Sequence, residues 1–307
     1  MPAFAAQTFR QWFANQSPRN VNGPRVILWP DTFTNHFEPE VGKAAVEVLE
    51  AAGYSVELPR GGPLCCGRPL YDYGMLDLAK RQLRQILDRM RPEIEAGIPV
   101  VGLEPSCVAV FRDELLNLFP HDEDAKRLAR QTFAFSEFLI QDDYIPPALE
   151  GRALLHGHCH QKALFGMKND AELLEKLGLD YESPATGCCG LAGSFGYEAG
   201  DNYDVSVKAG ERVLLPAVRE AAKDALIITD GFSCRTQIAS GTDRRALHLV
   251  QVLKMALRDG GGPSGDYPEL GCFEEKPTRP GARSVALLAG AAMAGGALAW
   301  GLKRKLG

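Results

Sequence analysis

The apolar residues in the first half of the chain fall into short runs separated by segments with a helical period. Arg25–Trp29 and Ile98–Leu103 are nearly uninterrupted apolar runs of strand length. Between them, Val41–Ala52 has the spacing of an amphipathic helix. A second helix places apolar side chains on one face, at Leu76, Leu83, Leu87 and Met90. Strands that alternate with helices predict βαβ units and a parallel sheet.

The second half repeats this order of elements. Ala153–Leu155 and Leu226–Thr229 have the composition of buried strands, and the helical stretches Ala171–Leu177 and Val205–Ala222 lie between them. The fold class that this predicts is α/β, with two tandem pseudo-repeated βαβ cysteine-rich modules and a C-terminal hydrophobic helix.

Cysteines follow the repeat. Cys188 comes 123 residues after Cys65, and Cys234 comes 127 residues after Cys107. The same offset of 127 residues places Thr32 where the second copy has Cys159. The loops that leave the carboxyl ends of parallel strands usually carry the ligands of such a fold. These loops are where the cysteines fall.

Composition shifts divide the chain further. Residues 1–22 form an N-terminal connector, 23–150 a first module with an incomplete cysteine set, and 151–257 a second module with a complete one. Residues 258–282 have linker composition, and 283–307 form a hydrophobic tail. The tail contains Ser284–Leu302, which is uncharged and just long enough to span a bilayer, or else to dock on a partner protein.

Overall composition narrows the function classes. A net charge of −5 gives no basic face for a nucleic-acid partner. The N-terminus has no secretory signal, so we expect a cytoplasmic protein associated with the membrane through residues 284–302. In a reducing compartment, most of the eight cysteines would hold metal rather than form disulfides.

The second module offers four candidate thiolate ligands. They are Cys159, Cys188, Cys189 and Cys234, the number that a four-iron cluster needs. A vicinal pair can reach one site only if the backbone turns, and the glycine that follows permits the turn. Structural zinc is the alternative metal, although no CxxC hook is present. A vicinal disulfide is the other alternative, and it would be strained.

The first module offers an incomplete set. Cys65, Cys66 and Cys107 recur there, Thr32 replaces the fourth thiol, and Asp31 could add an oxygen ligand. These residues form a second candidate metal site or a relic kept for its fold, and we favour the relic.

Three histidines flank Cys159. His156, His158 and His160 are either packing residues or neighbours of a redox centre, where they would donate hydrogen bonds or carry protons.

The motifs together resemble the CCG, or cysteine-rich, domain family. They are Leu64–Leu70, Glu104–Cys107, His156–Ala163, Gly187–Gly196 and Asp230–Cys234. The chain is most similar to the C-terminal iron–sulfur portion of FAD-linked oxidases of the D-lactate or glycolate type, and to proteins like the iron–sulfur subunit of heterodisulfide reductase. Some family members have a fifth cysteine ligand, but Glu104 and Gly231 occupy the extra positions here.

This resemblance implies a function. It implies an iron–sulfur electron-transfer subunit or domain of a FAD-linked 2-hydroxy-acid dehydrogenase, with one [4Fe-4S] cluster, or two if the first module also binds one. The FAD would sit on a partner subunit, and electrons would pass toward quinone or another acceptor. The alternatives are a thiol/disulfide redox subunit like that of heterodisulfide reductase, and a non-catalytic metal-binding scaffold.

Overall fold

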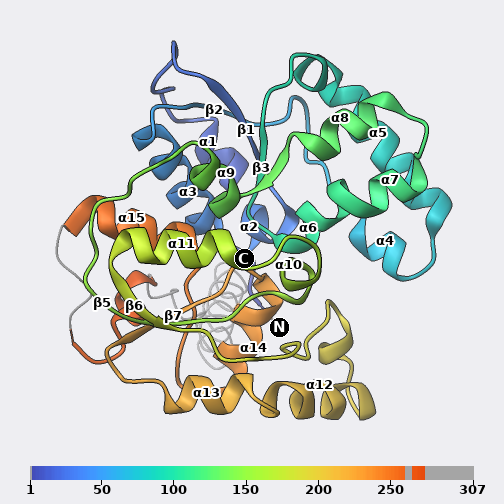
Figure 1. Ribbon diagram of the computed structural model, residues 1–307. Helices are drawn as coiled ribbons and strands as arrows, with labels where there is room; N and C mark the ends of the chain where they lie inside the picture. Colours follow the sequence, from blue (N-terminus) through green and yellow to red (C-terminus); the bar gives the residue numbers. More distant parts are fainter. Residues whose placement is uncertain (1, 260–264, 274–307) are drawn as a thin grey trace, which may run out of the picture. The chain divides into compact units, whose positions relative to one another are not determined.

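Two parallel β-sheets, one from each half of the chain, organise the computed structural model, which describes residues 2–259 and 265–273 (Figure 1). The first sheet has the strand order β2-β1-β3-β4 and the second has β6-β5-β7. The fold is therefore α/β with parallel sheets, as predicted. The predicted hydrophobic tail helix lies outside the described residues.

The strands are short, with three to five residues each. Their bounds are β1 Arg25–Trp29, β2 Ser55–Glu57, β3 Val100–Gly102, β4 Thr132–Ala134, β5 Gly151–Leu155, β6 Leu179–Glu182 and β7 Ala225–Ile228. In the first sheet Ile27 pairs with Val100, and in the second Ala153 pairs with Leu226. The three interior strands, β1, β3 and β5, are each parallel to both of their neighbours, and buried parallel strands of this kind are rich in apolar residues.

Helices fill the connections. In the first half they are α1 Phe9–Phe13, α2 Thr32–His36, α3 Pro39–Ala51, α4 Arg68–Asp72, α5 Leu76–Glu95, α6 Pro105–Ala109, a π-helical turn Val110–Glu114, α7 Leu115–Leu118, α8 Glu123–Arg130 and α9 Phe135–Gln141. In the second half they are α10 Cys159–Leu164, α11 Lys168–Leu177, α12 Asp201–Glu211, α13 Leu214–Glu220, α14 Phe232–Gly241 and α15 Leu249–Asp259, with 3-10 turns at Phe195–Tyr197 and Pro268–Cys272.

The predicted repeat is present in these elements. In chain order, β1, α2, α3, β2 and β3 of the first half correspond to β5, α10, α11, β6 and β7 of the second. The short helix α6, which carries Cys107, corresponds to α14, which carries Cys234. The offsets between the cysteines therefore reflect two copies of one arrangement of strands and helices.

The structure differs from the prediction at two elements. The single helix expected over Val205–Ala222 is divided into α12 and α13. Pro216 explains the break, because proline fits the first turn of α13 but not the interior of a longer helix. The strand β4 was not predicted, since three residues are too few to set a pattern.

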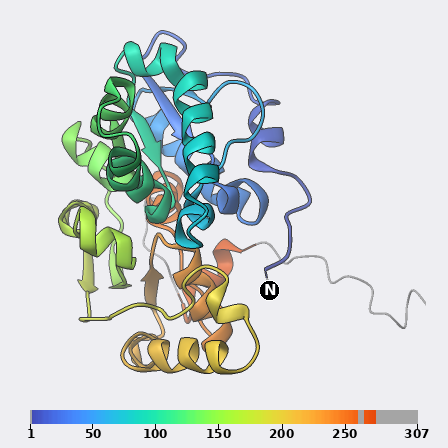
Figure 2. The ribbon, with the colours of Figure 1, turned by 90° about the vertical axis from the view of Figure 1, so that its right-hand side faces the viewer.

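The last helix of each half packs against the other half. Helix α15 lies along α3, and α9 lies along α11 (Figure 1). Figure 2 shows α15, in orange, among the blue elements of the first half. Ion pairs reinforce the first contact, with Glu47 3.0 Å from Lys254 Nζ and 2.9 Å from Arg258 Nη2. In each half, the last helix thus packs against a helix of the other half, and we call this arrangement the exchange of helices.

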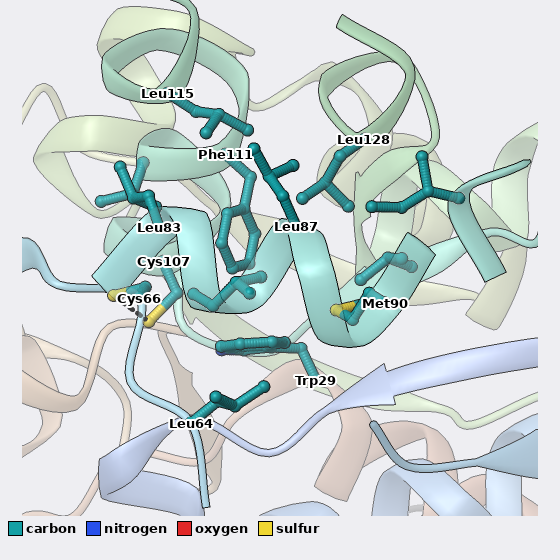
Figure 3. Close-up of a cluster of buried hydrophobic side chains, with 14 of the residues drawn as sticks. Trp29, Leu64, Cys66, Leu83, Leu87, Met90, Cys107, Phe111, Leu115 and Leu128 are labelled. Atoms are coloured by element: carbon teal, nitrogen blue, oxygen red, sulfur yellow. Dashed lines mark hydrogen bonds between the residues drawn. The ribbon is translucent and has the colours of Figure 1, made fainter. Parts of the chain in front are cut away.

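Each half has its own apolar core. In the first, Trp29 meets Phe111 edge to face, with ring centroids 4.8 Å apart. Cys66 and Cys107 lie at the margin of this core and point toward each other (Figure 3). Cys189 and Cys234 belong to the corresponding core of the second half. One side of each cysteine set is therefore held by close packing.

Among the residues that the structure describes, no helix is both long and apolar enough to cross a membrane.

Candidate metal centre

The four cysteines of the second module converge at one end of its sheet. Cys159 opens α10 just after β5, Cys188 and Cys189 lie in the loop after β6, and Cys234 lies in the first turn of α14 after β7. The three strands are parallel neighbours, so their carboxyl ends meet at the same edge. None of the eight cysteines, all of which lie in described segments, forms a disulfide.

The four thiols form a row in which each interacts with the next. The interaction between Cys159 and Cys188 is the main cause that raises the pKa of the Cys159 thiol and lowers that of Cys188. Cys189 bonds to both Cys188 and Cys234, which raises the pKa of Cys189 and lowers that of Cys234. Thiolates are therefore favoured at Cys188 and Cys234, and a thiolate is the form that binds metal.

Exposure differs across the set. Cys189 and Cys234 are buried in the core, whereas Cys159 and Cys188 are exposed. A group held by all four sulfurs would be anchored on one side and accessible from the surface on the other.

Glycine at the third position of the CCG motif is required by the backbone. Gly190 has a φ of +94°, and a Cβ there would lie 2.0 Å from the Ser206 carbonyl oxygen. Gly67 in the first motif has a φ of +85°. Both values are in the left-handed region that favours glycine, so the predicted turn after each vicinal pair is present.

Three histidines surround the sulfurs. The ligand atoms of His158, Cys159 and His160 lie within 4.8 Å of one another, and the two imidazoles stack with centroids 5.2 Å apart. His158 Nδ1 accepts from the backbone N–H of His160 at 3.2 Å, so its ring proton is on Nε2 when the ring is neutral.

His156 lies behind Cys234. Its Nδ1 is 2.6 Å from Thr186 Oγ1. Its Nε2 is buried without a conventional hydrogen-bond partner, yet the ring is close enough to lower the pKa of the Cys234 thiol.

The first module brings Cys65, Cys66 and Cys107 together. The sulfurs of Cys66 and Cys107 are 3.0 Å apart, and the Thr32 hydroxyl bonds to Cys65. Asp31 caps α2 through Oδ1, while its Oδ2 is buried without a partner. Burial, and then the nearby Glu104 carboxylate, raise the pKa of Asp31 to about 6. The three thiols and the Asp31 carboxylate are therefore close enough to act on one another.

Two residues at these sites connect the two modules, which the sequence pattern did not predict. Glu104 bonds to Ser106 in α6 through Oε1 and accepts from the backbone N–H of Phe232 at the start of α14 through Oε2, at 2.9 Å. Arg68, which follows the first CCG motif, donates to His160. Glu104 could have been suspected as a helix cap because it precedes Pro105. No local signal distinguishes Arg68.

The residues of the second module fit a thiolate-bound metal group. Four thiols share one site, two of them favour the thiolate, and Nδ1 of His160 and Nε2 of His156 are buried polar atoms with no partner in the described part of the chain. A group bound to the four sulfurs would give these two nitrogens a partner. Sulfur-rich sites of this kind suit iron–sulfur clusters and zinc.

Comparison with known proteins matches the same regions. The family model for the cysteine-rich domain matches residues 32–112 and 154–239. A subunit of the anaerobic glycerol-3-phosphate dehydrogenase of Escherichia coli (strain K12) is 28% identical over 263 residues, which cover 84% of this chain and 65% of that protein. The chain thus matches just under two thirds of that relative's length.

Two further relatives differ in length. Lactate utilization protein A of Geobacillus kaustophilus is 32% identical over 251 residues, 75% of this chain and 98% of that protein. The D-2-hydroxyglutarate dehydrogenase of Pseudomonas putida is 28% identical over 234 residues, which cover 74% of this chain but only 22% of that much longer protein.

Proposed function

Since this chain belongs to the cysteine-rich CCG domain family, we propose that it is the iron–sulfur electron-transfer subunit of a dehydrogenase that oxidises a 2-hydroxy acid. The observation that carries the proposal is the meeting of four thiols at the carboxyl ends of three adjacent parallel strands. The names of the relatives support the dehydrogenase context, since they include one subunit of a dehydrogenase, a lactate utilization protein and a 2-hydroxy-acid dehydrogenase.

Cys159, Cys188, Cys189 and Cys234 would hold one [4Fe-4S] cluster. Such a cluster supplies one-electron transfer. The buried pair, Cys189 and Cys234, would fix its position, and the exposed pair would leave one side within reach of a donor or acceptor. His156, His158 and His160 would lie beside the ligands as hydrogen-bond donors.

The first module would be a relic. Cys65, Cys66, Cys107 and Asp31 are the residues that would hold a second metal group if one binds, but Thr32 supplies a hydroxyl where the second module has a thiol. The proposal is therefore one cluster per chain, with about four irons.

FAD would reside on a partner dehydrogenase subunit, with quinone or another carrier as acceptor. The partner would oxidise its substrate at the flavin and pass single electrons to this chain. The uncharged stretch of residues 284–302 would hold the complex at the cytoplasmic face of the membrane. Removing residues 284–307 should then move the chain from the membrane to the soluble fraction without loss of iron.

The decisive experiment is anaerobic purification followed by iron and sulfide analysis. We expect about four of each per chain, loss of both in Cys188→Ser, and full retention in Cys272→Ser, because Cys272 belongs to neither set. Zinc without sulfide would instead support a structural scaffold. Full iron in Cys188→Ser would refute the ligand assignment. Oxidation of D-lactate or glycolate by the chain alone would refute the subunit role.

One observation favours a second function. Cys159 and Cys188 are both exposed free thiols that lie beside each other, so a disulfide substrate could approach the centre as in heterodisulfide reductase. Electron-dependent cleavage of a disulfide by the reduced protein would support this function, and its absence would leave the electron-transfer role.

A further inference from the structure

Arg68 belongs to the first module but contacts the candidate centre of the second. It is the first residue of α4, directly after the first CCG motif. Its Nη1 donates to Glu114, its Nε lies 3.1 Å from Asp72 Oδ1, and its Nη2 donates to Nε2 of His160. Two carboxylates thus hold the guanidinium that donates to the imidazole. Only 15% of the Arg68 side chain is exposed.

This contact decides where the His160 ring carries its proton. A guanidinium has donors and no acceptor, and it stays protonated in proteins. Nε2 of His160 must therefore accept, so the neutral ring carries its proton on Nδ1. This Nδ1 is buried and finds no acceptor among the described residues. His158 stacks on one face of the His160 ring and so limits the rotation of that ring.

The sulfurs of the candidate centre lie beside this ring. A ligand nitrogen of His160 lies within 4.8 Å of the Cys159 sulfur, and Cys188 also acts on the ring electrostatically. We propose that Arg68 is a positioning residue for the metal centre of the second module, because it fixes His160 as an Nδ1–H donor toward the sulfurs of that centre. The inference rests on the proposed iron–sulfur function.

The expected effect is on the reduction potential. Reduction adds one negative charge to the centre, and an N–H donor stabilises the more negative state. Losing one charge-assisted hydrogen bond should lower the ratio of reduced to oxidised centre about tenfold at a fixed solution potential, a shift of about 59 mV for a one-electron couple. The iron content should not change, because no ligand is altered.

The variant must not leave a buried charge unpaired. Arg68→Met alone would strand the Glu114 carboxylate, so it is combined with Glu114→Gln, and Glu114→Gln alone is the baseline. Arg84→Met is the matched control, because Arg84 pairs with Asp122 in the same module and carries the same charge. All variants are made in the full chain.

The first measurement is the tautomer of His160, read from ring nitrogen shifts in long-range proton–nitrogen NMR of the histidine-labelled chain. We expect the proton on Nδ1 in the native chain, in Glu114→Gln and in Arg84→Met, and loss of that preference in Arg68→Met/Glu114→Gln. An unchanged tautomer in the double variant would overturn the proposal. This measurement needs no cluster, so a native chain without iron would refute the proposed function and leave this result readable.

The second measurement is the midpoint potential, followed by electron paramagnetic resonance. Arg68→Met/Glu114→Gln should lower it relative to Glu114→Gln. In a His160→Phe background, the same pair of changes should produce no further shift, since Arg68 would act through His160. An equal shift in both backgrounds would mean that the charge of Arg68 acts directly, and it would overturn the positioning role.

Discussion

Asp31 and Thr32 stand in the first module where His158 and Cys159 stand in the second. In both modules the first residue of the pair caps a short helix, Asp31 for α2 and His158 for α10. Both modules therefore have a side-chain cap at this point, but Thr32 supplies a hydroxyl where Cys159 supplies a thiol. This single position separates the complete cysteine set from the incomplete one.

Replacing Thr32 by cysteine should therefore complete the first set. The hydroxyl of Thr32 already bonds to Cys65, so a thiol at this position would join Cys65, Cys66 and Cys107. We expect the iron content of Thr32→Cys to rise from about four toward about eight per chain, measured after anaerobic reconstitution. Thr34→Cys, on the same helix but outside the set, is the control. Seven or eight irons in the native chain would show that the first module is no relic.

The buried Asp170 should make the protein less stable at higher pH. Desolvation, and then the charge of Asp230, raise the pKa of Asp170 to about 8, while Gln161 bonds to it at 2.8 Å. The folded state keeps this proton and the unfolded state releases it near pH 4, so stability is lost as the pH rises toward 8. Asp170→Asn has no carboxyl group at this position, so its stability lacks this pH dependence.

Urea unfolding at pH 5 and pH 7 under reducing conditions measures the difference. The free energy of unfolding should fall with pH by about 1 kcal/mol per unit more in the native chain than in Asp170→Asn. Equal slopes in the two proteins would show that Asp170 is charged in the fold.

Helices and strands were predicted where the sequence pattern is local. The apolar runs located β1, β3, β5 and β7, and the helical period located α3, α5 and α11. What the pattern could not reveal are partners distant in sequence. The pairing of α15 with α3, the Phe232 bond to Glu104 and the Arg68 bond to His160 all depend on tertiary packing.

The cysteine sets could be grouped from sequence for a related reason. Parallel strands bring their carboxyl ends to one edge, so the loop positions alone predicted that Cys159, Cys188 and Cys234 would meet. No comparable rule predicts from the sequence which side chains form hydrogen bonds with one another. The roles of His158 and His160 therefore became visible only with their partners in place.

Glu104 joins two cysteine-bearing helices, and this junction can be tested. Glutamine has one acceptor oxygen, so in Glu104→Gln it can accept from the backbone N–H of Ser106 in α6 or from that of Phe232 in α14, but the two N–H groups no longer have an oxygen each. We expect the free energy of unfolding to fall by about 1–3 kcal/mol, measured by urea titration. Exposed Glu95→Gln should change it by less than about 0.5 kcal/mol. A fall no larger than this control would show that the shared carboxylate is not important for the junction.

The two modules should not fold apart from one another. A fragment of residues 1–150 would lack α15, which covers α3, and α11, the partner of α9. We expect this fragment to show no cooperative unfolding transition by circular dichroism, because the apolar face of α3 is left in water. A chain of residues 1–273 keeps both contacts and should unfold in one transition. A cooperative transition in the short fragment would contradict this expectation.

The exchange of helices also has a consequence during synthesis. Helix α3 ends at residue 51 and its partner α15 begins at residue 249, so about 200 residues are translated between them, which takes ~10–40 s at typical rates. For that time the nascent first module lacks one layer of its core. A chaperone that shields apolar helices has its longest opportunity to bind at α3.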